Sequence, residues 1–255
     1  MKTIVYQAFS GNKPVWIDRC ISTVKEWARA NSFDYQFIGD QMLDYVPQWY
    51  RNKVGDKIAL VADLARLKLA REYLSYGYER TIWVDADIVI FDTEKFSIDV
   101  NCSYAFGREV WCDLASDGRL LCTERVNNGV LVFTGKNRLL LDLYILAFKI
   151  NIKRIQKNHI PFDVHIRFLT NLYKYIKIPL LTNVGQFSPA VMDSIFNNKV
   201  NLLREYMDSF GLPMYASNLC LSCRNRNREG IMINDDMYGK VIDRLMETKG
   251  EFLNG

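Results

Sequence analysis

Residues 81–91 read TIWVDADIVIF, a near-continuous apolar run that is broken only by the carboxylates of Asp85 and Asp87. Such a run is typical of a central strand that is covered on both faces of its sheet. In open α/β sheets ligands lie beyond the carboxyl ends of the strands, which is where we expect the two aspartates. Side chains two residues apart in an extended chain point to one side, so both carboxylates are predicted to face the same space.

Two carboxylates held close together repel each other and are costly to bury. A hard divalent cation removes that cost, because Mg²⁺ and related ions prefer oxygen ligands from one or two carboxylates together with substrate phosphates. The D-x-D spacing of Asp85 and Asp87 therefore predicts a site for Mn²⁺ or Mg²⁺. The alternative is a strand end that carries two solvated acids.

Residues 56–76 are the most strongly predicted helix of the chain, and apolar residues occupy nearly its whole circumference, which indicates a buried helix. Asp63 and Arg66 lie three residues apart and share one stripe of this helix. A local ion pair is the ordinary explanation, but a buried helix seldom keeps such a pair without a partner or ligand. Arg donates to phosphate or sugar hydroxyls and Asp accepts from hydroxyls, so the pair is predicted to bind a ligand.

Strand-like and helix-like segments alternate through the first half of the chain at the spacing of βαβ units. The pattern predicts an α/β fold with a Rossmann-like mixed sheet flanked by helices and a less regular C-terminal extension.

We divide the chain into a core at 1–135 and an acceptor-side part of the same domain at 136–255. Expected strands are 3–9, 35–38, 102–106, 120–123 and 129–133; expected helices are 17–30, a short one within 41–54, 139–157, 162–175 and 235–246, with a loop-rich region at 179–233.

The composition excludes several classes of protein. With 49% hydrophobic and 24% charged residues, the 255-residue chain is neither disordered nor collagenous nor a coiled coil. A net charge of +4 does not argue for nucleic acid as a partner. No apolar run approaches the roughly 18–20 residues of a membrane-spanning helix, and the first residues do not read as a secretory signal.

The six cysteines are expected to be reduced thiols, which favours a cytoplasmic protein. Cys220 and Cys223 form a single C-x-x-C, but no second pair and no nearby His completes a tetrahedral zinc site. His165 is expected to be an ordinary hydrogen-bonded histidine rather than a metal ligand.

The strings ADLARLKL (62–69) and IWVDAD (82–87) resemble glycosyltransferases of the GT-A fold. The most similar group has the DXD sugar-binding region and includes family 32 mannosyltransferases and glucosylating toxin domains. Val5-Tyr6-Gln7, with Trp16 and residues 34–36, is similar to the first nucleotide-binding unit of that group. The resemblance covers about half of the chain, residues 3–133, and is specific mainly over residues 58–92.

The resemblance implies a role for each matching residue. Asp87 would coordinate the Mn²⁺ or Mg²⁺ that bridges the diphosphate of a nucleotide sugar. Asp85 would contact the ribose and complete the metal shell. Asp63 and Arg66 would hold the donor sugar, and the base and ribose pocket would contain Tyr6, Gln7 and Ile38.

Two further sites are less distinctive. Asn128, in Asn127-Asn128-Gly129, matches an amide that binds the donor sugar in related transferases, whereas Asn-Gly between β-prone segments also signals a hairpin turn. Asn218 or Ser222 would supply a third metal ligand, although the Trp found near that position in many relatives is absent.

The implied activity is metal-dependent transfer of a sugar from a UDP- or GDP-sugar to a hydroxyl acceptor, a glycan or lipid-linked saccharide in polysaccharide synthesis. The resemblance favours retention of anomeric configuration, with the leaving diphosphate as base. An inverting enzyme would need a separate general base, for which Asp163, Asp235 and Asp236 are available.

Lys149, Lys153, Arg154 and Lys157 form a basic stripe on one predicted helix. A solvated helix face explains such a stripe. A surface that meets anionic lipid at the inner face of the membrane is the alternative, and it would suit a lipid-linked acceptor.

Two other functions stay open. An apolar strand ending in D-x-D also suits a haloacid-dehalogenase-type phosphatase, with Asp85 as nucleophile, Asp87 as acid/base and residues 231–236 as a late acidic motif. Two strand–helix units precede the strand here, whereas the nucleophile strand of that class opens the domain. The third interpretation is a non-catalytic module that binds a nucleotide sugar.

Overall fold

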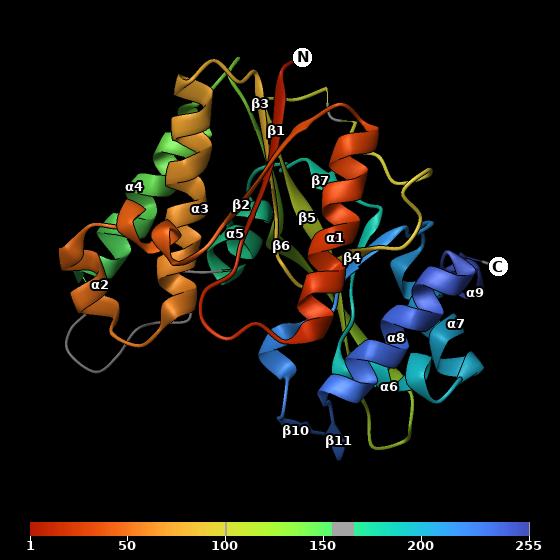
Figure 1. Ribbon diagram of the computed structural model, residues 1–255. Helices are drawn as coiled ribbons and strands as arrows, with labels where there is room; N and C mark the ends of the chain where they lie inside the picture. The colour runs from red at the N-terminus through yellow and green to blue at the C-terminus, as the bar shows by residue number, and fades with distance from the viewer. Residues whose placement is uncertain (100, 155–165, 255) are drawn as a thin grey trace.

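A six-stranded mixed sheet forms the centre of the computed structural model, which describes residues 1–99, 101–154 and 166–254 (Figure 1). The strand order is β2-β1-β3-β6-β5-β7. The strands are β1 (Thr3–Ala8), β2 (Asp34–Ile38), β3 (Arg80–Val84), β5 (Tyr104–Leu114), β6 (Leu120–Thr134) and β7 (Leu180–Leu181). β1 is parallel to both β2 and β3, whereas β6 is antiparallel to β3 and β5. The mixed sheet flanked by helices is confirmed.

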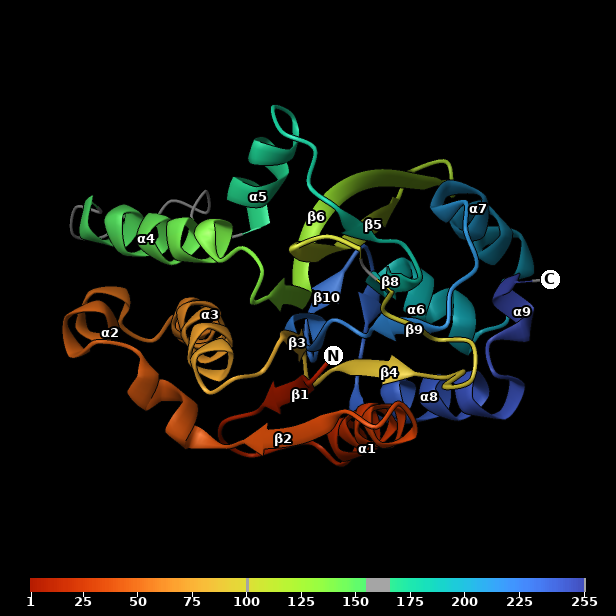
Figure 2. The ribbon, with the colours of Figure 1, turned by 90° about the horizontal axis from the view of Figure 1, so that it is seen from above.

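Helices cover both faces of this sheet (Figure 2). On one side lie α3 (Ile58–Ser75), α4 (Leu139–Arg154) and α5 (Ile166–Tyr173), with η1 (Asp40–Tyr45) and α2 (Gln48–Val54) beside α3. On the other side lie α1 (Val15–Ala30) and the C-terminal helices. α3 is buried on most of its circumference, as the apolar pattern predicts, because it packs between the sheet and α4.

The apolar run 81–91 was expected to be one strand, and this is wrong. β3 belongs to the central sheet, whereas β4 (Ile88–Ile90) belongs to a second, three-stranded sheet in the order β4-β9-β8. Its other strands are β8 (Val184–Gln186) and β9 (Ala216–Asn218). Residues 85–87 form a turn between the two sheets, closed by the Ile88 amide donating to the Asp85 carbonyl at 3.1 Å. Both strands are buried, so hydrophobicity alone does not reveal that they separate.

The segments predicted at 120–123 and 129–133 belong to one long strand, β6. Its partner β5 pairs Phe106 with Leu131 and Gly107 with Asn127, so β6 carries a bulge at residues 128–130. The hairpin interpretation of the Asn-Gly sequence is therefore wrong, because the turn between these strands lies near residues 115–119. The bulge turns the Asn128 region out of the regular ladder.

Cys112 and Cys122 pair in register across β5 and β6 and form a disulfide. The expectation that all six cysteines are free thiols is wrong for this pair. Sequence spacing did not reveal it because the two residues meet only through the register of the hairpin.

Residues 179–233 contain more regular structure than expected. The C-terminal elements are α6 (Pro189–Phe196), α7 (Val200–Phe210), η3 (Leu221–Cys223), β10 (Asn227–Arg228), β11 (Ile231–Met232), α8 (Asp235–Thr248) and α9 (Glu251–Asn254). Ser188 caps α6 by accepting from the Val191 amide, and Pro189 occupies the first turn. Ser-Pro is a helix-start signal that the sequence contains. Among the described helices none is long and apolar enough to cross a bilayer.

Residues 155–165 lie outside the described residues, and Lys157, Asp163 and His165 fall within them. The helix expected at 139–157 is observed as α4 up to Arg154. The division of the chain at residue 135 stays a prediction.

Candidate active site

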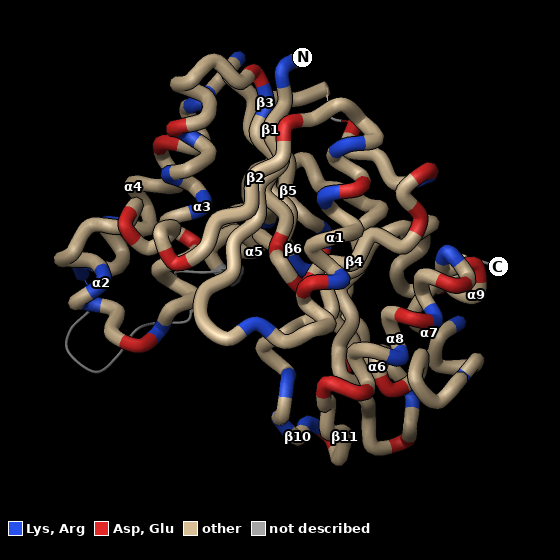
Figure 3. Tube along the Cα trace, in the orientation of Figure 1, with Lys and Arg blue, Asp and Glu red and all other residues tan. Residues whose placement is uncertain are grey.

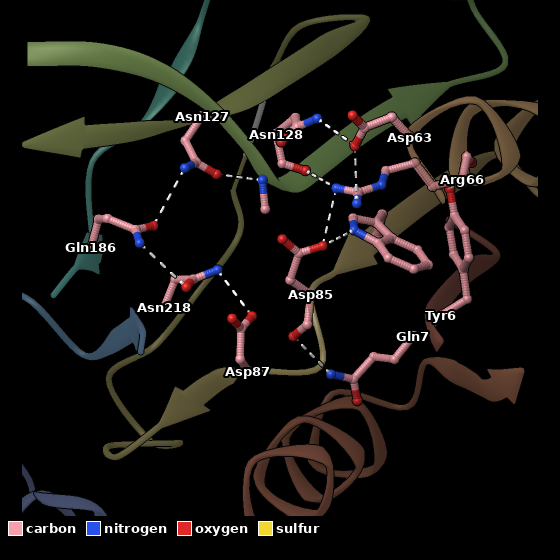
Figure 4. A network of polar contacts seen from close by, with 12 residues as sticks. Tyr6, Gln7, Asp63, Arg66, Asp85, Asp87, Asn127, Asn128, Gln186 and Asn218 are labelled. Atoms are coloured by element: carbon pink, nitrogen blue, oxygen red, sulfur yellow. Dashed lines mark hydrogen bonds and ion pairs between the residues drawn. The ribbon is translucent and has the colours of Figure 1, made fainter. Parts of the chain in front are cut away.

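A cavity of about 540 Å³ opens beyond the carboxyl end of β3, where the central sheet and the second sheet separate (Figure 4). Each neighbouring element contributes polar side chains to its wall. They include Asp63 and Arg66 from α3, Asp85 and Asp87 from the turn, Glu109 from β5, Asn127 and Asn128 from β6, Gln186 from β8 and Asn218 from β9. Asp113, Arg125, Ser222 and Arg228 complete the polar lining, so the predicted Ser222 also reaches the cavity. Both aspartates of the D-x-D face this cavity, as predicted, but a turn rather than extended chain brings them together.

The backbone bulge of β6 and the indole of Trp83 position Asp85. Its amide donates to the Gly129 carbonyl at 2.7 Å, which joins the start of the turn to the bulge. Its Oδ1 accepts from Trp83 Nε1 at 2.7 Å and lies 3.0 Å from Arg66 Nη1. Gln7 Nε2 donates to the Asp85 carbonyl at 3.2 Å. The carboxylate is therefore held through one of its two oxygens.

Arg66 is the centre of a buried network, and only 7% of the residue is exposed. Its Nη2 lies 3.1 Å from Asp63 Oδ1, and its Nη1 donates to the Asn128 carbonyl at 2.8 Å. The Asn128 side chain returns to the helix, with Nδ2 donating to Asp63 Oδ1 at 2.9 Å. The guanidinium also lies over the Trp83 ring, 4.8 Å from its centroid. The predicted Asp63–Arg66 ion pair thus exists, and it extends to Asp85 and Asn128.

A second polar chain holds Asp87. Its Oδ1 accepts from Asn218 Nδ2 at 3.1 Å, and its Oδ2 accepts from the Leu221 amide at 2.8 Å. Asn218 Oδ1 in turn accepts from the Cys220 amide at 2.7 Å. This arrangement directs the amide NH₂ of Asn218, rather than its oxygen, at Asp87. Asn218 orients Asp87 here, and its amide would have to turn over to act as a metal ligand.

The wall opposite α3 carries Glu109, Asn127 and Gln186. Asn127 Nδ2 donates to Glu109 Oε2 at 2.6 Å and to Gln186 Oε1 at 3.3 Å. Glu109 is 4% exposed, and Arg125 lies 3.6 Å from its other oxygen. This wall gives the cavity polar groups on the side away from the Asp63–Arg66 pair.

Burial raises the pKa of three carboxyl groups in this site, those of Asp85, Asp87 and Glu109. The pKa of Asp85 rises to about 7 because burial outweighs the opposing Arg66 guanidinium. Burial also raises the pKa of Asp87, against the hydrogen bond from Leu221, and that of Glu109, against the hydrogen bond from Asn127. Burial therefore disfavours the charged form of each of these three carboxyl groups, and Arg66 offsets only part of that effect at Asp85.

We expect Asp85→Asn to become more stable relative to the wild type as pH rises. The pKa of Asp85 is higher in the folded chain than the ordinary value of about 3.9. The protonated Asp85 carboxyl therefore contributes fully to the free energy of unfolding below about pH 4, and this contribution is lost as pH rises through about 7. Asparagine does not ionise, so only the wild type should lose this contribution. Urea denaturation with a chelator present should therefore show that the stability of the variant relative to the wild type rises by about 1–3 kcal/mol between about pH 5 and pH 8. An equal difference at both pH values would contradict this.

We found no protein-family model and no curated protein sequence that matches the chain. Among solved structures, it is similar to a glycosyltransferase involved in the glycosylation of the major capsid of PBCV-1, with a TM-score of 0.53 and 10% identity over 95% of this chain and 100% of that one. The fold is of the GT-A type.

Two other solved structures have lower TM-scores. The galactosyltransferase LgtC, in complex with donor and acceptor sugar analogues, has a TM-score of 0.45 and 13% identity over 94% of this chain and 95% of its own. Mouse xyloside xylosyltransferase 1 has a TM-score of 0.44 and 10% identity over 87% of this chain and 99% of its own. The finer resemblance to the family 32 group stays a prediction.

The donor atoms in this GT-A fold fit a hard divalent cation that shares its shell with a substrate. In the described part of the chain no group of three or more His, Cys, Asp or Glu side chains is arranged to enclose a metal. Asp85 and Asp87 supply carboxylates, and no hydrogen bond between described residues engages Asp85 Oδ2. Mg²⁺ is commonly bound by one or two carboxylates, with waters and phosphates completing the shell.

The residues predicted for the base and ribose pocket do not line the cavity. Tyr6 is 1% exposed, and its hydroxyl donates to the Arg66 carbonyl at 2.8 Å. Gln7 is fully buried and supports Asp85, while Ile38 packs in the core at the end of β2. Tyr6 and Gln7 thus contact the two charged residues from behind, and nucleotide binding by all three residues stays a prediction.

Sequence reasoning missed Glu109 and Gln186. Glu109 lies in an otherwise mostly buried strand, a weak signal that the sequence contains. Gln186 ends a three-residue strand in the segment expected to be loop, so no pattern indicated it. Cys220 and Cys223 also line the cavity, with their sulfur atoms 3.3 Å apart.

Proposed function

We propose that this protein transfers a sugar from a nucleotide diphosphosugar, with UDP or GDP as the nucleotide, to a hydroxyl of a saccharide or lipid-linked saccharide. One observation carries the proposal: Asp85 and Asp87 share a turn that faces a polar cavity, beside the Asp63–Arg66–Asn128 network, in a GT-A fold. That combination supplies anionic ligands and sugar-binding groups at the carboxyl end of a central strand.

Asp85 and Asp87 are the residues that would hold Mn²⁺ or Mg²⁺. Such an ion supplies positive charge that stabilises the nucleoside diphosphate as it leaves. Arg66 keeps Asp85 in place through its ion pair of 3.0 Å. Asp63 is 1% exposed, and its Oδ1 accepts from Asn128 Nδ2 at 2.9 Å and lies 3.1 Å from Arg66 Nη2. In this proposal it acts on the donor sugar by holding the Asn128 amide and the Arg66 guanidinium, which would donate to sugar hydroxyls.

The opposite wall is the acceptor side in this proposal. Glu109 and Gln186 place an acid and an amide across the cavity from Asp63 and Arg66. We propose retention of anomeric configuration on the strength of the sequence resemblance. Nuclear magnetic resonance of the first product anomer distinguishes retention from inversion.

The test begins with donor hydrolysis in the absence of acceptor. The purified protein is incubated with UDP- and GDP-sugars, with Mn²⁺ or with a chelator, and nucleoside diphosphate is measured by chromatography. We expect release with one class of donor and only when the ion is present. The same donor with Mn²⁺ should raise the melting temperature, because preferential binding to the native state stabilises it.

The other two functions give different results in this test. Release of phosphate from a small phosphomonoester would favour the phosphatase. Asp85 follows the third strand in the chain rather than the first, and Arg66 pairs with it, which does not favour that function. Melting-temperature shifts with donor but no turnover with any acceptor would favour a binding module.

We expect Gly129→Ala to lower activity by about a hundredfold while changing stability little. A Cβ at this position would lie 2.8 Å from Asn127 Oδ1 and 3.2 Å from both Asp85 Oδ2 and Asn218 Nδ2. Those side chains must then shift, and a displacement of about 1 Å in a site costs about that factor. Donor hydrolysis and urea denaturation provide the two measurements.

Gly135→Ala is the matched control, because a Cβ there meets nothing closer than 3.8 Å. It should retain wild-type activity. Equal loss of activity in both variants, or none in Gly129→Ala, would contradict the role assigned to the bulge.

The compartment is not part of this proposal. A cytoplasmic location was expected because the cysteines were taken to be reduced, and the Cys112–Cys122 disulfide removes that support. A nucleic-acid partner is not proposed either.

A further inference from the structure

The outer face of α4 is apolar although it faces solvent. Four residues spaced at i, i+4, i+7 and i+11 form one stripe along the helix. Their exposed fractions are 64% for Leu139, 51% for Leu143, 51% for Leu146 and 37% for Ile150. We call these four residues the leucine stripe. Exposed large apolar side chains that lie together mark an interaction surface, whereas single ones need no explanation.

The opposite face of α4 already forms the core contact of this helix. Its buried residues are Leu141, Tyr144, Ile145, Phe148 and Ile152. The leucine stripe is therefore not needed to hold α4 on the protein. Leaving four large apolar side chains in water costs free energy unless another surface covers them.

Basic residues gather at the C-terminal end of the stripe. Lys149, Lys153 and Arg154 come from α4, and α2 adds Lys53, whose Nζ donates to the Lys153 carbonyl at 3.2 Å. Figure 3 shows Lys and Arg positions where α2 lies against the end of α4. Asp142, near the start of the helix, lies 3.7 Å from Arg71. The positive charge of this surface is thus concentrated beside Ile150.

Trp49 of α2 lies at the same end and is 39% exposed. The Lys153 ammonium lies over its ring, 5.6 Å from the centroid. Tryptophan beside lysine is the combination found at the boundary between lipid headgroups and acyl chains. An apolar stripe bordered by Lys and Arg is the pattern of a helix that lies in this boundary.

We propose that the leucine stripe of α4, with the basic residues and Trp49 at its end, docks on an anionic lipid bilayer. Each basic side chain contributes about 1 kcal/mol near an anionic leaflet, and the leucines contribute apolar burial. A second copy placed antiparallel on the stripe would set each basic end against Asp142 of the other copy. That single carboxylate already lies 3.7 Å from Arg71, so it would not offset Lys149, Lys153, Arg154 and Lys53 together. The charge therefore favours lipid over a symmetric dimer.

The docking surface is one helix away from the cavity. α4 packs on α3, and α3 carries Asp63 and Arg66 in the cavity wall. A bilayer bound at α4 would hold the cavity near the headgroups. Membrane binding does not rest on the proposed function, although it would suit transfer to a lipid-linked acceptor.

The experiment is vesicle flotation with the full chain. Vesicles of phosphatidylcholine alone are compared with vesicles of phosphatidylcholine and phosphatidylglycerol. We expect flotation with the anionic mixture only, and less of it at high salt because salt screens the attraction. No flotation of the wild type with either vesicle would overturn the proposal.

Two variants separate the apolar and electrostatic contributions. Leu143→Glu/Leu146→Glu should abolish flotation. Lys149→Glu/Lys153→Glu should weaken binding by about thirtyfold or more, because the loss of two basic charges at about 1 kcal/mol each already gives that factor. Neither pair of side chains lies in the cavity wall, so both variants should keep donor hydrolysis in solution. Urea denaturation verifies that they fold.

Each variant has a matched control at a distance from α4. Leu121→Glu/Leu212→Glu changes two leucines that are 61% and 45% exposed. Lys25→Glu/Arg29→Glu makes the same change of net charge on α1, on the other side of the sheet. Both controls should float like the wild type.

Three outcomes would overturn the proposal besides absent flotation of the wild type. They are flotation retained by Leu143→Glu/Leu146→Glu, flotation lost equally in the controls, and a dimer in light scattering that the leucine variant dissolves while no vesicle binds. Because flotation needs no donor, failure of glycosyl transfer and failure of membrane docking are distinguishable.

Discussion

Asp87→Asn is expected to lower turnover of the nucleotide sugar about a thousandfold or more while the protein stays folded. Asparagine has the shape of aspartate but no charge, so the proposed cation site would lose one of its two carboxylates. It also places an amide where Asn218 Nδ2 and the Leu221 amide now donate, at 3.1 Å and 2.8 Å. Removing one group that stabilises transition-state charge costs about 10²–10³ in turnover, and losing a metal ligand adds to that.

Steady-state donor hydrolysis measures the loss, and urea denaturation measures the fold. Burial disfavours the charged form of Asp87 and raises its pKa. This offsets part of the cost of the one hydrogen bond that asparagine cannot accept, about 1–3 kcal/mol, so the variant should stay folded. Asp18→Asn is the control and should keep full activity. Asp18 lies on α1, and its exposed carboxylate pairs with Lys13. If Asp87→Asn lost activity only in proportion to its unfolded fraction, the residue would be structural and the proposed function would fail.

Arg66→Met should destabilise the protein by about 3–5 kcal/mol. The substitution keeps the apolar stem but removes a buried cation that lies 3.1 Å from Asp63 Oδ1 and 3.0 Å from Asp85 Oδ1. It also removes the donor to the Asn128 carbonyl at 2.8 Å. Breaking a buried ion pair by deleting one partner costs about this much, because the remaining charges keep their desolvation penalty.

The midpoint of urea denaturation provides the measurement. Arg71→Met is the matched control on the same helix, since Arg71 is exposed and its partner Asp142 lies 3.7 Å away. Exposed pairs contribute about 0–1 kcal/mol, so the control should unfold near the wild-type midpoint. Similar midpoints for Arg66→Met and the wild type would show that the network around Arg66 does not hold the site together.

The local patterns of the sequence predicted much of the fold. The apolar circumference of α3 predicted its burial, and the alternating pattern predicted α1, β1 and β2 close to their observed bounds. Asp63, Arg66, Asp85 and Asp87 were all singled out, and the structure brings them to one cavity. Charged residues inside apolar segments are informative because burial is unfavourable for them unless they have partners.

Three features went unpredicted because they depend on pairing between distant strands. The run 81–91 divides between two sheets, although the strands in both halves are fully buried. Residues 128–130 form a bulge because β5 pairs with β6 in one register. The disulfide follows from that same register. Each strand partner is chosen by long-range packing, which a local pattern does not encode.

The amino-acid order alone was enough to mark the two acids of the turn and the ion pair on the helix as the chemical centre, because burying those groups without partners is unfavourable. Only the tertiary structure decided which other residues line the site and how they are oriented. Glu109 and Gln186 join it only because the middle of β5 and the end of β8 line the same cavity as the turn. Folding also decided that the Asn218 amide donates to Asp87, since the Cys220 amide holds its oxygen at 2.7 Å. Such orientations arise from the sum of many contacts between residues far apart in the chain.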